Sequence, residues 1–199
     1  MADHYVIVGL GNPGAKYAET RHNAGFWFLD LLAERSGAVF RSQSKFHVEL
    51  AKTGLYGQDC ILVKPMTFMN NSGQPVRALL DYYKISSDRL LIVYDELDLP
   101  PGVARLKQGG GHGGHNGLRD IFRHNPDHEF LRLRIGIGHP GRKDAVTGYV
   151  LSRPSAEQEL LTRRVISDAA DVMREVLSGE VPRAMKSLHT MSGAGEGNT

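Results

Sequence analysis

The fold is decided by the segment YVIVGLGNPG at residues 5–14, where an apolar run ends in a glycine-rich turn. The run Tyr5–Val8 has the continuous apolar pattern of a buried strand, so we expect a strand at Tyr5–Gly9. Three glycines and a proline follow within six residues. A glycine-rich turn after a buried strand commonly allows backbone to approach a ligand closely. The segment therefore predicts a buried strand whose carboxyl end opens into a binding site.

Strand and helix patterns alternate along the remainder of the chain. Strands are expected at Val48–Thr53, Cys60–Lys64, Leu90–Tyr94, Gly102–Lys107 and Leu131–Ile137. Helices are expected at Ala24–Ser36, with Gly37 as its stop, from the N-cap Ser72 to Tyr83, at Ala156–Leu177 and at Val181–His189. This alternation predicts one α/β domain in which helices cover a largely buried sheet, with ligands at the carboxyl ends of the strands.

The length and composition of the chain fit one globular domain. With 199 residues and no internal linker or repeat, it can bury a single core, which we expect to span residues 1–189. The last ten residues, Thr190–Thr199, are small and polar, and we expect a disordered tail there. The single cysteine, Cys60, excludes a disulfide scaffold and favours a cytoplasmic location. No apolar stretch approaches the roughly 20 residues of a membrane helix, and no signal peptide fits before Tyr5.

Basic residues gather in one part of a chain whose net charge is only +2. They are Arg105, Lys107, Arg119, Arg123, Arg132, Arg134 and Arg142, against the acids Asp120, Asp127 and Glu129 in the same span. A local basic face on a near-neutral protein can hold a phosphate backbone. On charge alone, a solvated mixed surface explains the same residues equally well.

The turn at residues 9–14 matches the pattern G-x-G-x-x-G of dinucleotide-binding proteins, but its surroundings do not. In those proteins the third glycine already lies in the helix that holds the pyrophosphate. Here Pro13 prolongs the turn, and the helix is expected roughly ten residues later. The acid about 20 residues on, Glu34, falls inside that helix rather than at the end of a second strand. A nucleotide site is therefore disfavoured.

A histidine and an aspartate have the positions that a general base and its partner need. His22 precedes the helix at Ala24–Ser36, where the positive end of the helix dipole favours the neutral imidazole. A general base also needs an acceptor that orients its other nitrogen, and Asp95 follows the strand Leu90–Tyr94 at the expected ligand edge. The alternatives are that His22 caps or packs the helix, and that Asp95 is a turn residue before Pro100.

Asparagines accompany two loops that lead into expected helices. The carboxamide of Asn70 can donate to a developing oxyanion or hold a water. Asn116 belongs to a segment with six glycines in nine residues, which is either a flexible hinge or a surface of backbone amides for phosphate or peptide. His112 and His115 lie in this run and near Asp95 in sequence, but a flexible run does not preset a rigid metal cage. We therefore expect no metal.

Taken together, these segments resemble the bacterial peptidyl-tRNA hydrolases. The matching stretches are Ile7–Phe26, Lys64–Gly73, Asp95–Ile121 and Arg132–Pro140, in the order and spacing of that family. The resemblance implies a single-domain three-layer α/β/α sandwich with a twisted mixed central sheet. It also implies hydrolysis of the ester between a peptide, or an N-blocked amino acid, and tRNA, with no metal and no cofactor.

The resemblance assigns roles position by position. The catalytic histidine is His22, its supporting aspartate is Asp95, and the asparagine that senses a blocked amino group is Asn12. The residues that hold the substrate are Tyr17, Phe68, Asn70 and Asn116. The basic clamp for the tRNA 5′-phosphate falls on Lys107 and Arg134.

The expected partner is peptidyl-tRNA, contacted at its acceptor stem, CCA end and 5′-phosphate by a basic face that also includes Arg142 and Lys143. No obligate protein partner and no membrane are expected, and the family favours a monomer. Three alternatives remain open: a nucleotide-dependent Rossmann enzyme, a non-catalytic RNA-binding module, and an α/β peptidase that cleaves an amide. The first lacks a strand-end acid for ribose, and the second leaves His22, Asp95 and the asparagines unexplained.

Overall fold

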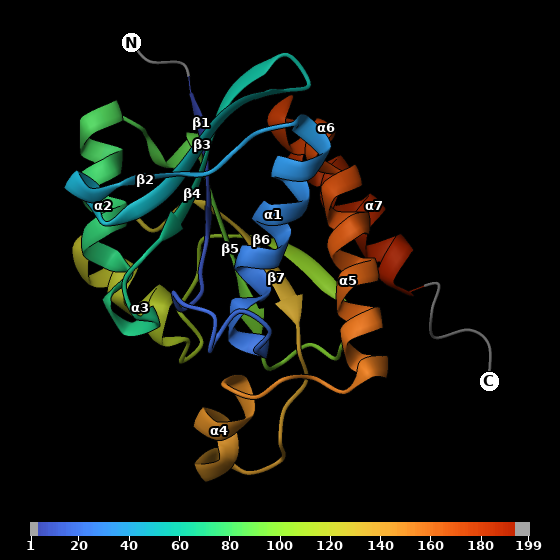
Figure 1. Cartoon of the computed structure of the whole chain (residues 1–199). Helices are drawn as coiled ribbons and strands as arrows, with labels where there is room; N and C mark the ends of the chain where they lie inside the picture. Colours follow the sequence, from blue (N-terminus) through green and yellow to red (C-terminus); the bar gives the residue numbers. More distant parts are fainter. Residues whose placement is uncertain (1–3, 194–199) are drawn as a thin grey trace.

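The strand predicted at Tyr5–Gly9 forms β1, which is buried at the centre of a seven-stranded sheet (Figure 1). The computed structural model describes residues 4–193. Across the sheet the strands follow the order β2 (Arg41–Gln43), β3 (Val48–Leu55), β4 (Gln58–Pro65), β1, β5 (Leu90–Glu96), β7 (Leu131–Gly136) and β6 (Ala104–Gln108). The four inner strands β4, β1, β5 and β7 are parallel, and the flanking pairs are antiparallel, so the sheet is mixed as predicted.

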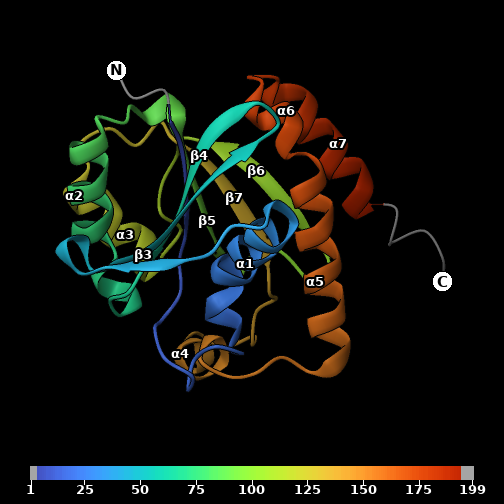
Figure 2. The same ribbon diagram turned by 45° about the horizontal axis from the view of Figure 1, so that its top comes forward.

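Helices cover both faces of the sheet, as Figures 1 and 2 show. One face carries α1 (Ala24–Ser36), α5 (Ala156–Asp171), α6 (Met173–Leu177) and α7 (Val181–Gly193), and the other carries α2 (Gly73–Tyr83) and α3 (Asn116–His124). Side chains alternate along β1, so that Ile7 packs on the α1 side while Val6 and Val8 pack on the α2 side. Burial on both faces explains the unbroken apolar runs of the inner strands. The predicted three-layer α/β/α sandwich is confirmed.

Glycines of the opening turn make room for helix α1. A Cβ atom on Gly11 would lie 2.8 Å from Cγ of Phe26, and one on Gly25 would lie 2.6 Å from the backbone nitrogen of Leu10. A Cβ atom on Gly9 would clash with the same helix. Glycine is therefore needed on both sides of the contact, because any larger residue would separate the turn from the helix. At Gly9 and Gly11 the space that a side chain would occupy is therefore filled by α1.

The helix predicted at Ala156–Leu177 is divided into α5 and α6. The break falls at Val172, whose backbone dihedrals are φ −86° and ψ 1°. Val165, Val172 and Val176 keep their helical spacing across the break and pack in the same core cluster. An interruption of one residue leaves the apolar period intact, so the sequence pattern does not reveal it.

The helix predicted at Val181–His189 continues as α7 to Gly193. Its last turn is held by the sheet, because the hydroxyl of buried Ser192 accepts a hydrogen bond from Arg105 of β6 at 2.7 Å. The tail predicted over 190–199 therefore overlaps α7, and its remainder lies outside the described residues. Within residues 4–193, no helix is both long and apolar enough to cross a lipid bilayer.

The start of α2 is capped by a residue distant in sequence. Ser72, the predicted N-cap, has αR backbone dihedrals, and its hydroxyl donates to the carbonyl of Met69 at 2.7 Å. The carboxylate of Asp120, from α3, accepts instead from the N–H of Gly73 at 2.8 Å. A buried helix start needs an acceptor for its unpaired N–H groups, and the neighbouring helix provides it.

The parallel strands bring their carboxyl ends to one edge of the sheet. The loops that leave this edge comprise residues 10–23 after β1, 66–72 after β4, 97–103 after β5 and 137–145 after β7. The short helix α4 (Val146–Val150) projects beyond the same edge in Figure 1. In an open α/β sheet this edge is where ligands bind, and every loop singled out from the sequence except the glycine run leaves a strand here.

Candidate active site

A cleft of about 670 Å³ opens at this edge of the sheet. Seven of the nine site residues predicted from the sequence line it: Asn12, Tyr17, His22, Phe68, Asn70, Asp95 and Asn116. The other two, Lys107 and Arg134, are absent from its described lining. The carboxyl ends of the parallel strands and the start of α3 therefore bring together residues that are far apart in the chain, such as Asn12 and Asn116.

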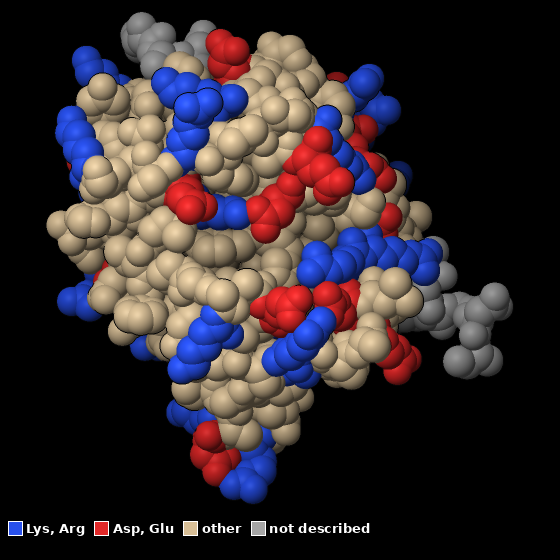
Figure 3. Space-filling model, viewed as in Figure 1, with Lys and Arg blue, Asp and Glu red and all other residues tan. Residues whose placement is uncertain are grey.

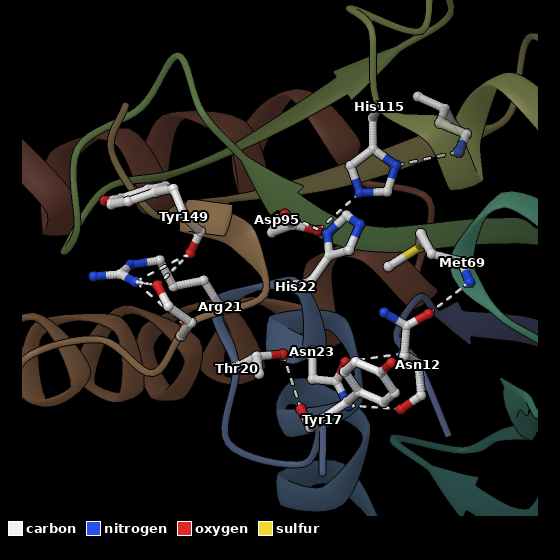
Figure 4. A network of polar contacts seen from close by, with 12 residues as sticks. Asn12, Tyr17, Thr20, Arg21, His22, Asn23, Met69, Asp95, His115 and Tyr149 are labelled. Carbon is white, nitrogen blue, oxygen red and sulfur yellow. Dashed lines mark hydrogen bonds and ion pairs between the residues drawn. The ribbon is translucent and has the colours of Figure 1, made fainter. Parts of the chain in front are cut away.

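His22 and Asp95 form a buried hydrogen-bonded pair (Figure 4). His22 lies in the short 3-10 helix Arg21–Asn23, immediately before α1, and is 8% exposed. Asp95 lies near the end of β5 and is 3% exposed. The distance between His22 Nδ1 and Asp95 Oδ2 is 2.8 Å. Because a carboxylate can only accept, the neutral imidazole carries its proton on Nδ1, and Nε2 is the nitrogen that can take a proton.

A second histidine holds the other oxygen of the same carboxylate. Nε2 of His115 lies 2.8 Å from Oδ1 of Asp95. Nδ1 of His115 accepts from the backbone N–H of Leu118 at 3.2 Å, so His115 caps α3 and its proton is on Nε2. The glycine-rich composition around His115 predicts a flexible residue, and the structure shows a fixed one. The sequence does contain a signal that His115 is fixed: it directly precedes the expected helix start at Asn116, and an N-cap residue is held in place by the helix that it caps.

The pKa values of the pair follow from burial and mutual attraction. Burial alone raises the pKa of Asp95, but the charges and hydrogen bonds of His22 and His115 outweigh it and hold that pKa below its usual range. Burial alone lowers the pKa of His22, but the Asp95 carboxylate outweighs it and raises that pKa above the ordinary 6.5. The carboxylate, and not the predicted effect of the helix dipole, therefore decides the direction in which the pKa of His22 is shifted.

His22, Asp95 and His115 also satisfy the geometry of a three-ligand metal group. One ligand atom from each lies within 4.8 Å of the others. Both carboxylate oxygens and the two facing ring nitrogens are already joined by hydrogen bonds at 2.8 Å. A cation would have to displace two ring protons and break both bonds, so the polar network competes directly with metal binding.

The carboxamide of Asn12 is held in one orientation. Its Oδ1 accepts from the backbone N–H of Met69 at 2.7 Å, so its NH2 group is a donor for the cleft (Figure 4). Asn23 braces the Asn12 backbone from the other side, accepting from its N–H at 2.9 Å and donating to its carbonyl at 3.0 Å. Asn23 is not among the site residues predicted from the sequence, although it directly follows His22.

Aromatic and amide side chains form the outer part of the cleft. The rings of Tyr17 and Phe68 meet edge to face, with centroids 6.2 Å apart, and Phe68 is 56% exposed. Asn70 and Asn116 are exposed, and Oδ1 of Asn116 accepts from Arg119 at 3.2 Å. Apolar surface beside unburied amides suits a ligand that is partly apolar and partly a hydrogen-bonding backbone.

The basic residues on β6 and β7 differ in availability. Lys107 is exposed, whereas Nε of Arg134 is 3.0 Å from Glu96 Oε2. Arg132, which is expected on the basic face from the sequence, is 1% exposed. Its guanidinium donates to the carbonyls of Gly109 and Gly111, the latter at 2.8 Å.

Two corrections follow. Arg132 anchors the glycine run instead of facing a ligand, and the run is held more firmly than its composition predicts. On the view in Figure 3, cationic and anionic side chains are interspersed.

Comparison with known proteins places the chain in a family. The family model described as Peptidyl-tRNA hydrolase matches residues 6–195. A peptidyl-tRNA hydrolase of Halorhodospira halophila is 54% identical over 184 residues, which cover 92% of this chain and 95% of that protein. One from Stenotrophomonas maltophilia is 54% identical over 190 residues, covering 96% and 99% of the two chains.

The structures agree with the sequences. The crystal structure of peptidyl-tRNA hydrolase from Acinetobacter baumannii matches this fold with a TM-score of 0.91 at 48% sequence identity, covering 95% of this chain and 96% of that one. Family model, relatives and structure each span nearly the whole chain, including every strand end that builds the cleft. This protein belongs to the peptidyl-tRNA hydrolase family.

Proposed function

We propose that this protein hydrolyses the ester bond between the peptide and the tRNA in peptidyl-tRNA, with His22 as the general base. The observation that carries the proposal is the pair formed by His22 and Asp95 at the wall of the cleft. The carboxylate holds the proton on Nδ1 and leaves Nε2 able to accept one. Membership of the peptidyl-tRNA hydrolase family supports the ester of peptidyl-tRNA as the substrate.

The reaction needs one water and no other reactant. Nε2 of His22 takes a proton from the water as its oxygen bonds to the ester carbonyl carbon. Asp95 stabilises the imidazolium that forms, and its depressed pKa keeps it ionised throughout. The tetrahedral intermediate then expels the terminal ribose oxygen, which receives the proton from His22. The products are a tRNA with a free hydroxyl and a peptide carboxylic acid, which releases its proton to solvent and becomes a carboxylate.

The asparagines supply donors around the reacting carbonyl. We assign oxyanion stabilisation and positioning of the water to Asn70 and Asn116, which line the cleft with His22. The NH2 group of Asn12 is fixed by the bond from Met69 to its oxygen, and it would bind a carbonyl of the blocked amino group. A free amino group offers no such acceptor, which accounts for a preference for N-blocked substrates.

The tRNA is proposed to lie over the glycine run and the basic residues beside it. Lys107 would bind the 5′-phosphate, because it is exposed and close to the backbone of Gly110. Arg134 would join it only if its pairing with Glu96 is exchanged for a phosphate. Arg142 and Lys143 would extend the contact along the acceptor stem. A tRNA substrate implies a cytoplasmic site of action.

The assay compares two esters of the same amino acid. The protein is incubated with N-acetyl-aminoacyl-tRNA and, separately, with unblocked aminoacyl-tRNA, and free tRNA is measured. We expect release from the blocked substrate, little from the unblocked one, and no change on addition of EDTA. An N-acetylated peptide amide serves as a control for peptidase activity. No release from the blocked ester would overturn the proposal, and loss of activity in EDTA would overturn its metal-free form.

A further inference from the structure

A second buried network lies beside the pair formed by His22 and Asp95, and the proposed chemistry makes no use of it. Arg21, the residue before His22, is 8% exposed. Its Nη1 donates to the carbonyl of Tyr149 at 3.1 Å and to Oγ of Ser152 at 2.5 Å, and its Nη2 donates to Gln158 at 2.8 Å. The guanidinium also stacks on the ring of Tyr149, 4.0 Å from its centroid (Figure 4).

This network is unusual because it holds a buried charge without a counter-charge. No carboxylate of the described residues forms an ion pair with Arg21. Its partners are backbone carbonyls, a hydroxyl and an amide, and all of them belong to the segment 149–158. A buried cation bound in this way adds little net stability, since desolvation offsets its hydrogen bonds. The network instead fixes the distance between the loop that carries His22 and the segment 149–158, which are far apart in the chain.

The segment 149–158, to which Arg21 donates its hydrogen bonds, adjoins one side of the cleft. Val146, Thr147, Val150 and Leu151, here called the α4 wall, line the cleft that His22 also lines. In Figure 1 α4 projects from the body of the protein and is joined to it by two loops. The wall is fastened on the side of His22 by Arg21 and on the side of β7 by the hydroxyl of Tyr149, which donates to the carbonyl of Ile137 at 2.5 Å.

We propose that Arg21 is a positioning residue that fastens the α4 wall to the loop carrying His22. The cleft then keeps a constant width between its apolar side and the general base, and the acyl part of the substrate binds in that space. This inference rests on the proposed function for its effect on substrate, but the fastening itself is a property of the free protein. Loss of Arg21 loosens the wall and weakens binding, while His22 remains held by Asp95.

The test replaces Arg21 by lysine, which keeps the charge but loses the planar fork and the stacking on Tyr149. For R21K we expect KM for N-acetyl-aminoacyl-tRNA to rise by about tenfold, as for the loss of one charged hydrogen bond. The value of kcat should change little, and the acid limb of the pH profile should stay in place. Amide hydrogen exchange should become faster at residues 146–152. The matched control is R164K, an exposed arginine of α5 outside the segment 149–158, which should match the wild type in all four measurements.

Two results would overturn the inference. One is wild-type KM and wild-type exchange at residues 146–152 in R21K. The other is a fall in kcat with a displaced acid limb and unchanged KM, which would place the effect on His22 instead of the wall. If R21K does not fold, S152A and Y149F each remove one fastening contact, and unchanged exchange in both would contradict the proposal. The exchange measurement needs no substrate, so it decides the fastening even if the wild type fails to cleave peptidyl-tRNA.

Discussion

Nδ1 of His22 lies 2.8 Å from Oδ2 of Asp95, and this contact determines which nitrogen of the imidazole can act as a base. The opposite oxygen of Asp95 is held at the same distance by His115, so the carboxylate can neither rotate nor shift without losing a bond.

Removing the imidazole of His22 should remove the base and leave substrate binding intact. We expect H22A to lower kcat by about 100- to 10,000-fold, the usual contribution of a general base. Binding of tRNA, measured by filter retention, should stay within a factor of about two of the wild type. H189A, on the exposed side of α7, is the control and should keep full activity. Retention of activity in H22A would exclude His22 as the base.

The acid limb of the pH–rate profile should report the pKa of His22. Only the neutral imidazole is a base, so the rate should fall as pH drops through a pKa that Asp95 raises above 6.5. In D95N the charge is lost, and the acid limb should move to lower pH. The rate at its plateau should also fall, by up to about 10,000-fold if the Asn amide imposes the wrong tautomer. An acid limb at the same pH in D95N would show that another group controls it.

The same pair links stability to pH. The pKa of Asp95 is lowered by folding, so its contribution is present above about pH 4 and is lost as pH falls toward the folded value. The pKa of His22 is raised by folding, so its contribution is present below about pH 6.5 and is lost as pH rises through the folded value. The difference in free energy of unfolding between wild type and D95N should therefore be greatest near pH 5. Urea titrations at pH 5 and 8 measure it, and a larger difference at pH 8 would contradict the ionised pair.

Lys107 and Arg134 should differ in their contribution to tRNA binding. Lys107 is exposed, whereas Arg134 is engaged with Glu96. We expect K107A to weaken tRNA binding and to reduce the slope of log Kd against log salt concentration by about one, as for one lost phosphate contact. R134A should change that slope less. Equal changes in both variants would mean that Arg134 leaves Glu96 when tRNA binds.

The contact between the opening turn and α1 should not tolerate a methyl group. A Cβ atom on Gly25 would lie 2.6 Å from the backbone nitrogen of Leu10, so we expect G25A to lower the free energy of unfolding by about 1–3 kcal/mol. G54A is the control, because nothing lies within 4 Å of a Cβ atom there. It should stay within about 0.5 kcal/mol of the wild type. Equal stability of the two variants in urea would contradict the close approach.

Much of the fold was predictable from local pattern. The apolar run at Tyr5–Gly9 became a strand buried on both faces, and α1 ends at Gly37, which adopts the left-handed conformation with φ 66°. Asp95 and His22 were predictable as partners, because parallel strands place their carboxyl ends at one edge of the sheet. The residues after such strands therefore meet, whatever their separation along the chain.

Local sequence pattern accounts for the described strands other than β2, for most of the helices and for the strand ends that carry the site, because periodicity and turn chemistry act within a few residues. Tertiary structure decided the rest. It turned His115 toward Asp95, buried Arg132 beneath the glycine run, and used Arg21 to hold α4. Each of these contacts joins residues at least 20 positions apart. Their formation depends on how whole layers pack, and no local pattern encodes the distance between two side chains that meet only after the sheet and its helices are assembled.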